Sequence, residues 1–275
     1  MAIHADAGAA EAVASLADPT LSIEVIVVNT GFGSLRSSLA EALDRVVLIE
    51  SPRLRMPGGT RNLGLAEARG PIVAFLAADC LATTGWAARR MAAHVNTEAV
   101  ASAILPAPAA NGRVTLASLA VHMLIYCRRD PDAPVDRTMR YGVSYRREIF
   151  TRHGTFVEDR VVGEDTEFNT RLPVPPTWDP GIVTLHRNPA SFAAALADSW
   201  QRGARLRQWM TSNASRPTAR SMRWTVNGAV DAMTMLKHAS AERRGSLFAA
   251  APLVWCLALA RIGGALWQSG RQTRP

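Results

Sequence analysis

The sequence predicts an α/β fold in which a mixed, mostly parallel sheet is flanked by helices and followed by a helical appendage. Two observations support this prediction. Continuous apolar, β-branched runs recur in the first part of the chain, and helical stretches separate them. From about residue 190, strand signals become rare and helical stretches cover 190–211, 217–240 and 246–268. Strands and helices that alternate through short loops form a sheet with parallel crossovers.

The first predicted elements are a short helix over 9–17 and a buried strand over 23–28, IEVIVV. Asn29-Thr30-Gly31 bounds that strand, as turn residues do. A helix is then expected at about 34–43 and a second strand at 46–50. A strand that is apolar at every position is typical of a sheet with helices on both faces.

The next elements lead to an isolated carboxylate. Thr60 is expected to cap a helix that begins at Arg61, and a buried strand over 72–77 follows it. Asp79 comes directly after that strand. Ligands of α/β sheets bind at the carboxyl ends of strands, where Asn29 and Asp79 fall. Position alone leaves two interpretations of Asp79, a ligand contact or a cap for the following turn.

A second acidic position is Glu164-Asp165 in the segment GEDTEF. Carboxylates at the start of a helix are stabilised by the helix dipole, so an ordinary acidic first turn is one interpretation. The preceding residues, YGVSYRREIFTRHGTF, indicate a strand, a helix and a glycine-containing loop. This order would bring Glu164 and Asp165 to the same sheet edge as Asp79.

These motifs together resemble a family 2 glycosyltransferase of the GT-A fold. The segments that carry the resemblance are IEVIVV-NTG, GGTRNLGLAEARGPIVAFLAAD, YGVSYRREIFTRHGTF, GEDTEF and LHRNPASF, over roughly residues 10–205. Each segment alone would be a weak signal, but the combination and its spacing are specific. The resemblance implies transfer of a sugar from a nucleotide-sugar donor to an acceptor hydroxyl, with inversion and a divalent metal, Mg²⁺ or Mn²⁺.

The resemblance also assigns roles to particular residues. Asp79 corresponds to the last carboxylate of the family's D-x-D motif, which reaches the metal that bridges the donor diphosphate. His186, in LHRNP, lies where many relatives keep a histidine near the metal, although a surface or capping histidine is the alternative. Asp165 would be the general base, and Glu164 would orient the site or the acceptor.

Three further residues are expected to contact the donor. Asn29 stands where the family has a carboxylate that grips the base, and an amide there can still form hydrogen bonds. Arg61 and Asn62 retain the R-N motif of the family. A guanidinium at a helix N-terminus is well placed for a base or phosphate contact, whereas a solvated helix residue is the plainer interpretation of Arg61.

The chain departs from the family pattern in three places. Ala77 replaces the first carboxylate of D-x-D, and Asn29 replaces the base-binding carboxylate. Aligning residues 23–28 with the family's second strand leaves only a helix upstream, so we expect the family's first strand to be missing and a sheet edge to be unpaired. These departures favour an alternative, a degenerate, non-catalytic member that acts as a binding or assembly partner.

The charge is divided unevenly along the chain. Residues 201–275 carry 12 basic and two acidic side chains, whereas residues 1–200 carry 19 basic and 21 acidic ones. We therefore expect a glycosyltransferase domain over 1–205 and a basic, partly apolar helical tail over 206–275. No recognition module accompanies the basic residues, so we expect no nucleic-acid partner.

The tail suggests where the protein acts. The apolar run over 247–260 is interrupted by Pro252 and Arg261, which favours a helix in the membrane interface, with a buried packing helix as the alternative. Ten net positive charges favour an anionic membrane surface. We expect a cytoplasmic enzyme, peripheral at the inner membrane face, with a glycan or lipid-linked acceptor from cell-envelope or polysaccharide synthesis.

The three cysteines, Cys80, Cys127 and Cys256, lie far apart in the chain. Their spacing forms neither a disulfide framework nor a local metal motif. A reducing compartment is therefore the simplest interpretation.

Overall fold

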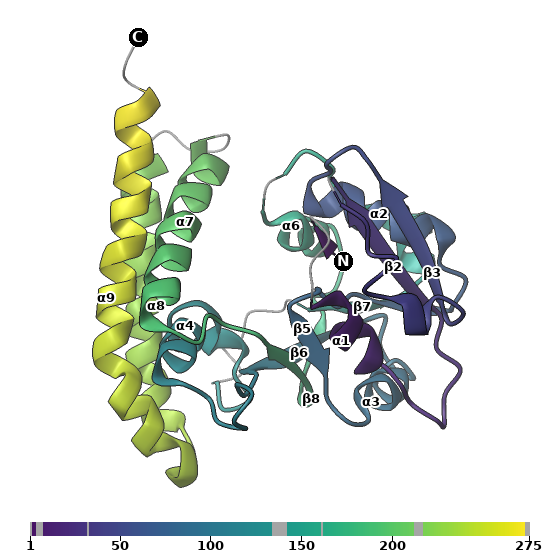
Figure 1. Cartoon of the computed structure of the whole chain (residues 1–275), viewed down its shortest axis with the longest axis horizontal. Helices are drawn as coiled ribbons and strands as arrows, with labels where there is room; N and C mark the ends of the chain where they lie inside the picture. The colour runs from purple at the N-terminus through teal and green to yellow at the C-terminus, as the bar shows by residue number, and fades with distance from the viewer. Residues whose placement is uncertain are drawn as a thin grey trace. The chain divides into compact units, whose positions relative to one another are not determined.

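The computed structural model describes residues 2–3, 8–31, 33–133, 142–160, 162–211 and 217–272. The chain divides into two compact units (Figure 1). The sheet unit comprises Met1–Ala103 and Arg140–His186, and the helical unit comprises Ile104–Met139 and Arg187–Pro275. We describe each unit by itself.

A three-stranded parallel sheet opens the sheet unit. Strand β1 (Ala2–Ile3), helix α1 (Ala9–Ala14), strand β2 (Val25–Thr30) and strand β3 (Val46–Ser51) follow one another, and the sheet order is β1-β2-β3. β1 pairs with the end of β2, with Ala2 opposite Asn29. A two-residue strand therefore occupies the place that we expected to be empty. Two residues produce no periodic pattern, so the sequence could not reveal this strand.

The segment between β2 and β3 corrects a second expectation. Residues 34–43 form turns and a 3₁₀ helix, η1 (Ala40–Ala42), rather than an α-helix. Leu35 and Leu39 are buried in the same apolar cluster as Val27 of β2. Their spacing of four residues is also that of an apolar helix face, which is why the sequence predicted a helix here. The backbone N–H of Leu35 donates to a carboxylate oxygen of Glu50 over 2.9 Å, so a side chain from β3 holds this loop.

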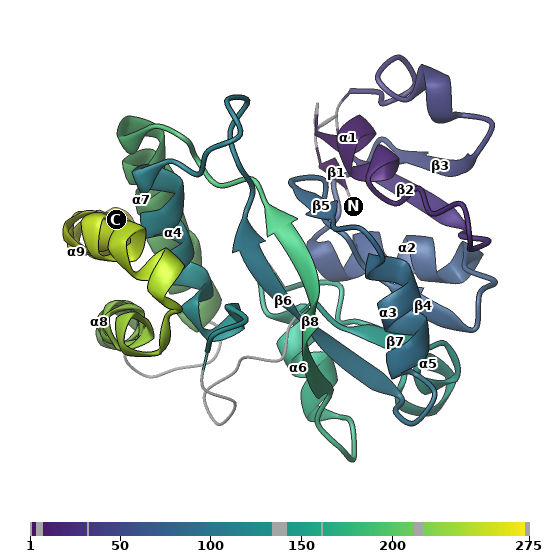
Figure 2. The same cartoon turned by 90° about the horizontal axis from the view of Figure 1, so that it is seen from below.

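A five-stranded sheet forms the rest of the sheet unit, in the order β4-β7-β6-β8-β5 (Figure 2). The pairs β4–β7, β6–β7 and β5–β8 are antiparallel. The mixed α/β class is confirmed, with parallel pairing found in β1–β3. The elements after β3 are α2 (Pro57–Glu67), β4 (Ile72–Ala74), β5 (Cys80–Ala82), α3 (Trp86–Ala93), β6 (Ala99–Pro106), β7 (Ser144–Arg146), α5 (Glu148–His153), α6 (Glu164–Thr170) and β8 (Thr177–His186).

The start of helix α2 differs from the sequence expectation. Helix α2 begins at Pro57 rather than at Arg61, because proline fits the first turn of a helix, where its missing N–H has no helical partner. Thr60 therefore lies inside the first turn, and its hydroxyl donates to the carbonyl of Met56 over 3.2 Å. The same hydroxyl lies 3.3 Å from that of Thr30 and ties α2 to the end of β2.

An aromatic cluster packs beneath α2 and α6. Its rings lie edge-on, tilted or stacked against one another, with centroids between 5.0 and 6.5 Å apart. The hydroxyl of Tyr145 donates to Asn169 over 2.8 Å, which fixes α6 against this core. Burial raises the pKa of Tyr145 well above its usual range, so the phenol stays protonated. The cluster comprises Phe75, Tyr145, Phe150, Phe156 and Phe168.

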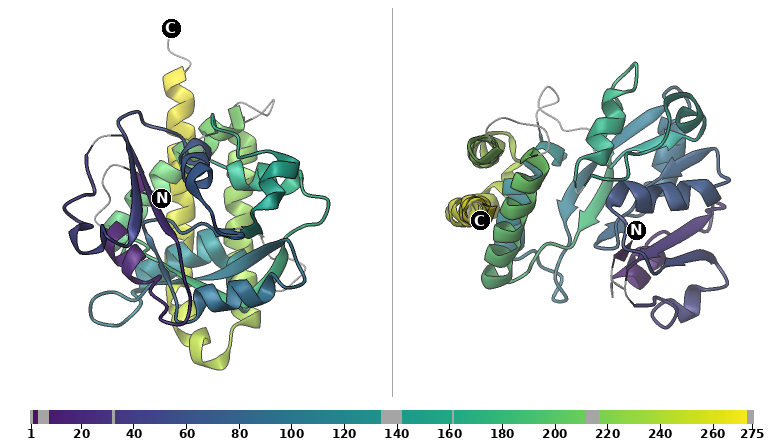
Figure 3. Two further views of the ribbon diagram at one scale, coloured as in Figure 1. Left: turned by 90° about the vertical axis from the view of Figure 1, so that its right-hand side faces the viewer. Right: turned by 90° about the horizontal axis from the view of Figure 1, so that it is seen from above.

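The helical unit contains α4 (Leu116–Tyr126), η2 (Cys127–Arg129), α7 (Phe192–Thr211), α8 (Pro217–His238) and α9 (Ala241–Gln272). The three long helices match the helical stretches in the sequence, and they lie side by side (Figure 3). Helix α4 is buried on nearly every side and packs against α7, α8 and α9. The helical unit thus includes α4, from the middle of the chain, whereas we expected a helical tail that begins at residue 206. The sequence of a helix that is apolar on every face does not reveal which elements bury it.

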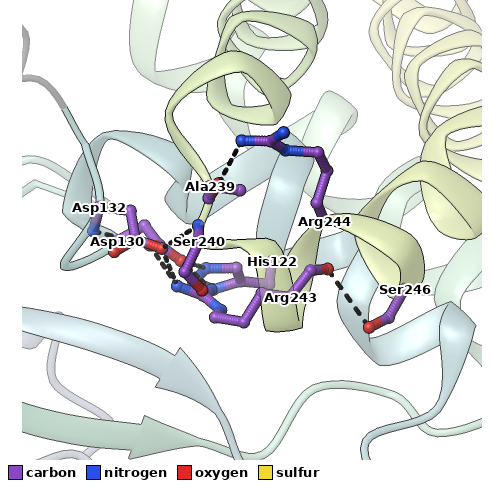
Figure 4. A network of polar contacts seen from close by, with 8 residues as sticks. All are labelled: His122, Asp130, Asp132, Ala239, Ser240, Arg243, Arg244 and Ser246. Carbon is purple, nitrogen blue, oxygen red and sulfur yellow. Dashed lines mark hydrogen bonds and ion pairs between the residues drawn. The ribbon is translucent and has the colours of Figure 1, made fainter.

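A polar network joins α4, the turn after η2 and the start of α9 (Figure 4). Nε2 of His122 lies 2.7 Å from Oδ2 of Asp130, and both side chains are fully buried. Arg243 donates to Oδ2 of Asp130 over 2.5 Å and to Asp132 over 2.8 Å. Burial opposes the charge of Asp130, but the bonds from Arg243 and His122 outweigh it and hold the pKa of Asp130 well below its usual range.

Candidate functional site

The first group of site residues lies where β5 meets the end of β8. Cys80 and His186 are directly opposite each other in this antiparallel pair, so their side chains project from the same face. Asp79 immediately precedes β5, and its Oδ2 lies 3.3 Å from Nε2 of His186. About half of the Asp79 side chain is exposed, whereas His186 is buried. The fold thus brings together Asp79 and His186, which are far apart in the sequence.

This group has the chemistry of a metal site. One ligand atom each from Asp79, Cys80 and His186 lies within 4.8 Å of the others. Carboxylate oxygen and imidazole nitrogen are both ligands of divalent cations. Ala77, two residues before Asp79, has no ligand atom to contribute. The residues present therefore fit a divalent cation, with a single carboxylate and with the thiol of Cys80, for which the spacing of the cysteines had predicted no metal motif.

The second group joins α2 to the start of α6. Nη1 of Arg61 lies 2.9 Å from Oε1 of Glu164 and 3.9 Å from Oδ2 of Asp165. The guanidinium also lies over the rings of Phe75 and Phe156, at 5.4 and 5.3 Å from their centroids. Arg61 is thus held by a close ion pair with Glu164, a longer one with Asp165 and two aromatic faces.

The two carboxylates of this group differ in their environment. Glu164 is buried, and this burial raises its pKa. The positive charge of Arg61 partly offsets this rise, and the negative charge of Asp165 adds to it. Asp165 retains 24% exposure of its side chain and lies 1 Å farther from Arg61. Glu164 is therefore the partner of Arg61, and Asp165 is the carboxylate that an incoming molecule can reach.

A close backbone approach sets this geometry. Gly58 lies in the first turn of α2, and a Cβ atom there would be 1.9 Å from the carbonyl oxygen of Val157. Only glycine permits this contact between α2 and the loop that leads to α6. The first glycine of PGGTRN, Gly58, thus has a packing explanation that the motif alone did not give.

Asn62 and Asn29 each hold a loop. The carboxamide of Asn62 donates to the carbonyl of Phe156 over 2.9 Å and accepts from its N–H over 3.0 Å. It also donates to Glu158 over 3.0 Å. Nδ2 of Asn29 donates to the carbonyl of Gly33 over 3.1 Å, and Asn29 is buried. Both amides shape loops beside the predicted site, and a contact of either one with the donor stays a prediction.

Glu50 is a polar residue of this region that the sequence analysis did not single out. The N–H of Leu35 and the hydroxyl of Ser34 hold the pKa of Glu50 below its usual value, with smaller contributions from Arg36 and Asn29. A lone carboxylate at the end of an apolar strand, VVLIE, was the available signal. Its role here is to order the loop after β2.

Comparisons with known proteins identify the family and the fold. The model of the family "Glycosyl transferase family 2" matches residues 7–157, more than half of the chain. A search of curated proteins found no match. The mannosyltransferase PcManGT from Pyrobaculum calidifontis, solved in complex with GDP-Man and Mn²⁺, aligns with a TM-score of 0.56 at 19% identity, covering 96% of this chain and 86% of that one.

A second solved structure, S. aureus TarS 1–349, aligns with a TM-score of 0.48 at 16% identity and covers 99% of this chain and 90% of that one. The sheet and its flanking helices agree with the family match. The chain belongs to glycosyltransferase family 2, with the GT-A fold, and is an enzyme of glycosyl transfer from a nucleotide sugar.

Proposed function

We propose that this protein is an inverting glycosyltransferase in which Asp165 is the general base. The observation that supports this assignment is the unequal pairing of the two carboxylates. Arg61 lies 2.9 Å from Glu164 and 3.9 Å from Asp165, so Asp165 keeps lone pairs for an acceptor. Asp165 is also the more exposed of the two side chains. A base must come within hydrogen-bond reach of the hydroxyl that it deprotonates.

The proposed reaction is a single displacement. Asp165 takes the proton of the acceptor hydroxyl as that oxygen forms a bond to the anomeric carbon. The bond from this carbon to the diphosphate oxygen breaks, and its electron pair leaves with the nucleoside diphosphate. Attack opposite the leaving group inverts the anomeric configuration. Glu164 keeps Arg61 in place beside Asp165 and is a positioning residue.

On the donor side, Asp79 and His186 are the proposed ligands of a divalent cation, Mg²⁺ or Mn²⁺. When bound, such a cation offsets the negative charge on the diphosphate. The 3.3 Å approach of the two side chains supports this pairing, as does the Mn²⁺ in the PcManGT complex. Arg61, Asn62 and Asn29 are proposed to contact the donor or to shape the loops around it.

The proposed acceptor is a glycan or a lipid-linked sugar, met at the inner face of the cell membrane. One face of α9 packs inside the helical unit, where Leu247, Val254 and Leu257 are buried. Another face presents an exposed apolar stripe along the helix. Ala241–Trp267 is long and apolar enough to cross a membrane, by length and composition alone. The stripe comprises Phe248, Trp255, Leu259 and Leu266.

An interfacial position suits this helix better than a span. One third of its most apolar window is buried within the helical unit, so only part of its surface is available to lipid. The basic excess of residues 201–275 favours an anionic surface, and apolar and charge contributions together stabilise such binding. We therefore propose a cytoplasmic protein that is peripheral at the membrane.

Three experiments test this proposal. Thermal stabilisation across a panel of nucleotide sugars, with and without Mn²⁺ or Mg²⁺, identifies the donor, and NMR of the product reports the anomeric configuration. Retention of configuration would contradict the single displacement. Cosedimentation with phosphatidylglycerol vesicles tests the membrane assignment, with neutral vesicles as the control. Replacing the exposed Phe248 and Leu259 with Asn should abolish sedimentation, and unchanged sedimentation would rule out the stripe as the docking surface.

A further inference from the structure

We propose that Cys80 is a third ligand at the Asp79–His186 site and makes this site prefer thiophilic cations of the Zn²⁺, Co²⁺ and Cd²⁺ class over Mg²⁺. The inference rests on the proposed function in one respect, because it takes Asp79 and His186 as metal ligands. It goes beyond that function by assigning the metal selectivity of the site to Cys80.

The position of Cys80 in the sheet supports this inference. Cys80 is the register partner of His186 in the antiparallel pair β5–β8, so the thiol and the imidazole project from the same face. Sγ of Cys80 lies 3.6 Å from Oδ1 of Asp79. Nε2 of His186 lies 3.3 Å from the other carboxylate oxygen. One carboxylate thus faces both partners, and the three ligand atoms fall within 4.8 Å of one another.

The chemistry of these ligands differs from that of an all-oxygen site. Mg²⁺ prefers oxygen ligands and binds thiolates poorly, whereas Zn²⁺, Co²⁺ and Cd²⁺ accept sulfur and imidazole. Ala77 removes one candidate oxygen ligand, and Cys80 supplies sulfur next to Asp79. Cys80 and His186 are both buried, so water competes less for their side of the site. The thiol releases its proton to solvent when it binds the cation.

Cobalt(II) is the probe that tests this inference, because a thiolate bound to Co²⁺ gives an intense near-ultraviolet charge-transfer absorption that oxygen and nitrogen ligands do not give. The full-length protein is titrated with Co²⁺ under reducing conditions, and binding is measured in parallel by equilibrium dialysis. We expect the absorption in the unmodified protein and its loss in Cys80→Ser. We also expect Cys80→Ser to bind Co²⁺ at least about tenfold more weakly than the unmodified protein. Mg²⁺ binding, measured by competition, should change little.

Cys256→Ser is the matched control, because Cys256 is an exposed thiol on α9 and should leave the absorption unchanged. Circular dichroism establishes that each variant is folded. Co²⁺ that binds with ligand-field bands alone, without the thiolate absorption, would keep the metal site of the proposed function and overturn the role of Cys80. Absence of Co²⁺ binding by dialysis would overturn both. Loss of the absorption in Asp79→Ala or His186→Ala, with the Cys80 thiol intact, would further support a shared site.

Discussion

Replacing Asp130 with Asn should destabilise the helical unit strongly. This carboxylate is fully buried, and it accepts from Arg243 of α9 and contacts His122 of α4 (Figure 4). Asn keeps the shape but removes the charge, so the guanidinium and the imidazole lose their shared anion. Removing one partner of a buried pair leaves the other without compensation and costs about 3–5 kcal/mol.

The size of the effect can be checked against a neighbouring pair. Asp132 also accepts from Arg243 over 2.8 Å, but its side chain is 28% exposed. Partly exposed pairs contribute roughly 0–1 kcal/mol. Asp132→Asn is therefore the matched control, with the same chemical change on the same arginine. The difference between the two variants should be about 2–5 kcal/mol.

The pH dependence follows from the lowered pKa of Asp130. A depressed pKa in the folded state stabilises the fold above the unfolded-state value of about 3.9, and this stabilisation is lost as the pH falls further. The gap between the parent protein and Asp130→Asn should stay constant from pH 7 to 5. Below about pH 4 it should shrink by roughly 1.4 kcal/mol per pH unit.

Urea unfolding followed by circular dichroism at several pH values measures these free energies. Unfolding of α4 and α7–α9 dominates the helical signal, and a loss of about 3–5 kcal/mol lowers Tm by roughly 10 °C or more. An Asp130→Asn variant as stable as Asp132→Asn would refute the buried network as the link between α4 and α9. A gap that widened on acidification would refute the assigned charge state.

Three more substitutions test the packing and the site. Gly58→Ala should force α2 and the Val157 loop apart by about 1 Å and lower transfer by roughly 10²-fold, and activity within threefold of the parent would contradict this. Gly264→Ala places Cβ 2.0 Å from the carbonyl of Trp200 and should cost about 1–3 kcal/mol in urea unfolding, so unchanged stability would refute the close α7–α9 contact. Arg61→Gln should destabilise the sheet unit at pH 8 by about 1–3 kcal/mol but less at pH 5, because Glu164 loses its cation and must then be neutral. Equal losses in urea unfolding at both pH values would contradict that pairing.

Much of the fold could be predicted from sequence because strong periodicity identifies long elements. The three long helices of the helical unit and strand β3 fall where the apolar pattern indicated them. Strand β1 has two residues and is defined by its partner β2, so it has no local signature. Helix α4 is apolar on every face, and only the folded helical unit reveals that α7, α8 and α9 bury it.

The site was predictable as motifs but not as contacts. The resemblance drew attention to Asp79, His186, Glu164 and Asp165, and the structure brings them together as two pairs. The different roles proposed for Glu164 and Asp165 depend on the burial of each side chain and on which of them Arg61 contacts. The spacing of the motifs along the sequence predicts neither. The spacing of the cysteines predicted no metal motif at Cys80, because its neighbour His186 lies 106 positions away in the sequence and only the pairing of β5 with β8 brings the two together.

The central claim is that Asp165 deprotonates the acceptor, and one rate comparison tests it most directly. Transfer of labelled sugar from the donor that stabilises the protein is measured for the parent, Asp165→Asn and Glu167→Gln. Glu167 lies on the same helix and pairs with Arg171 over 3.1 Å, so its variant is the matched control. We expect about 10²–10⁴-fold slower transfer for Asp165→Asn with unchanged donor-induced stabilisation, and near-parent transfer for Glu167→Gln. Equal transfer by Asp165→Asn and the parent would contradict the account, as would a parent protein that no nucleotide sugar stabilises.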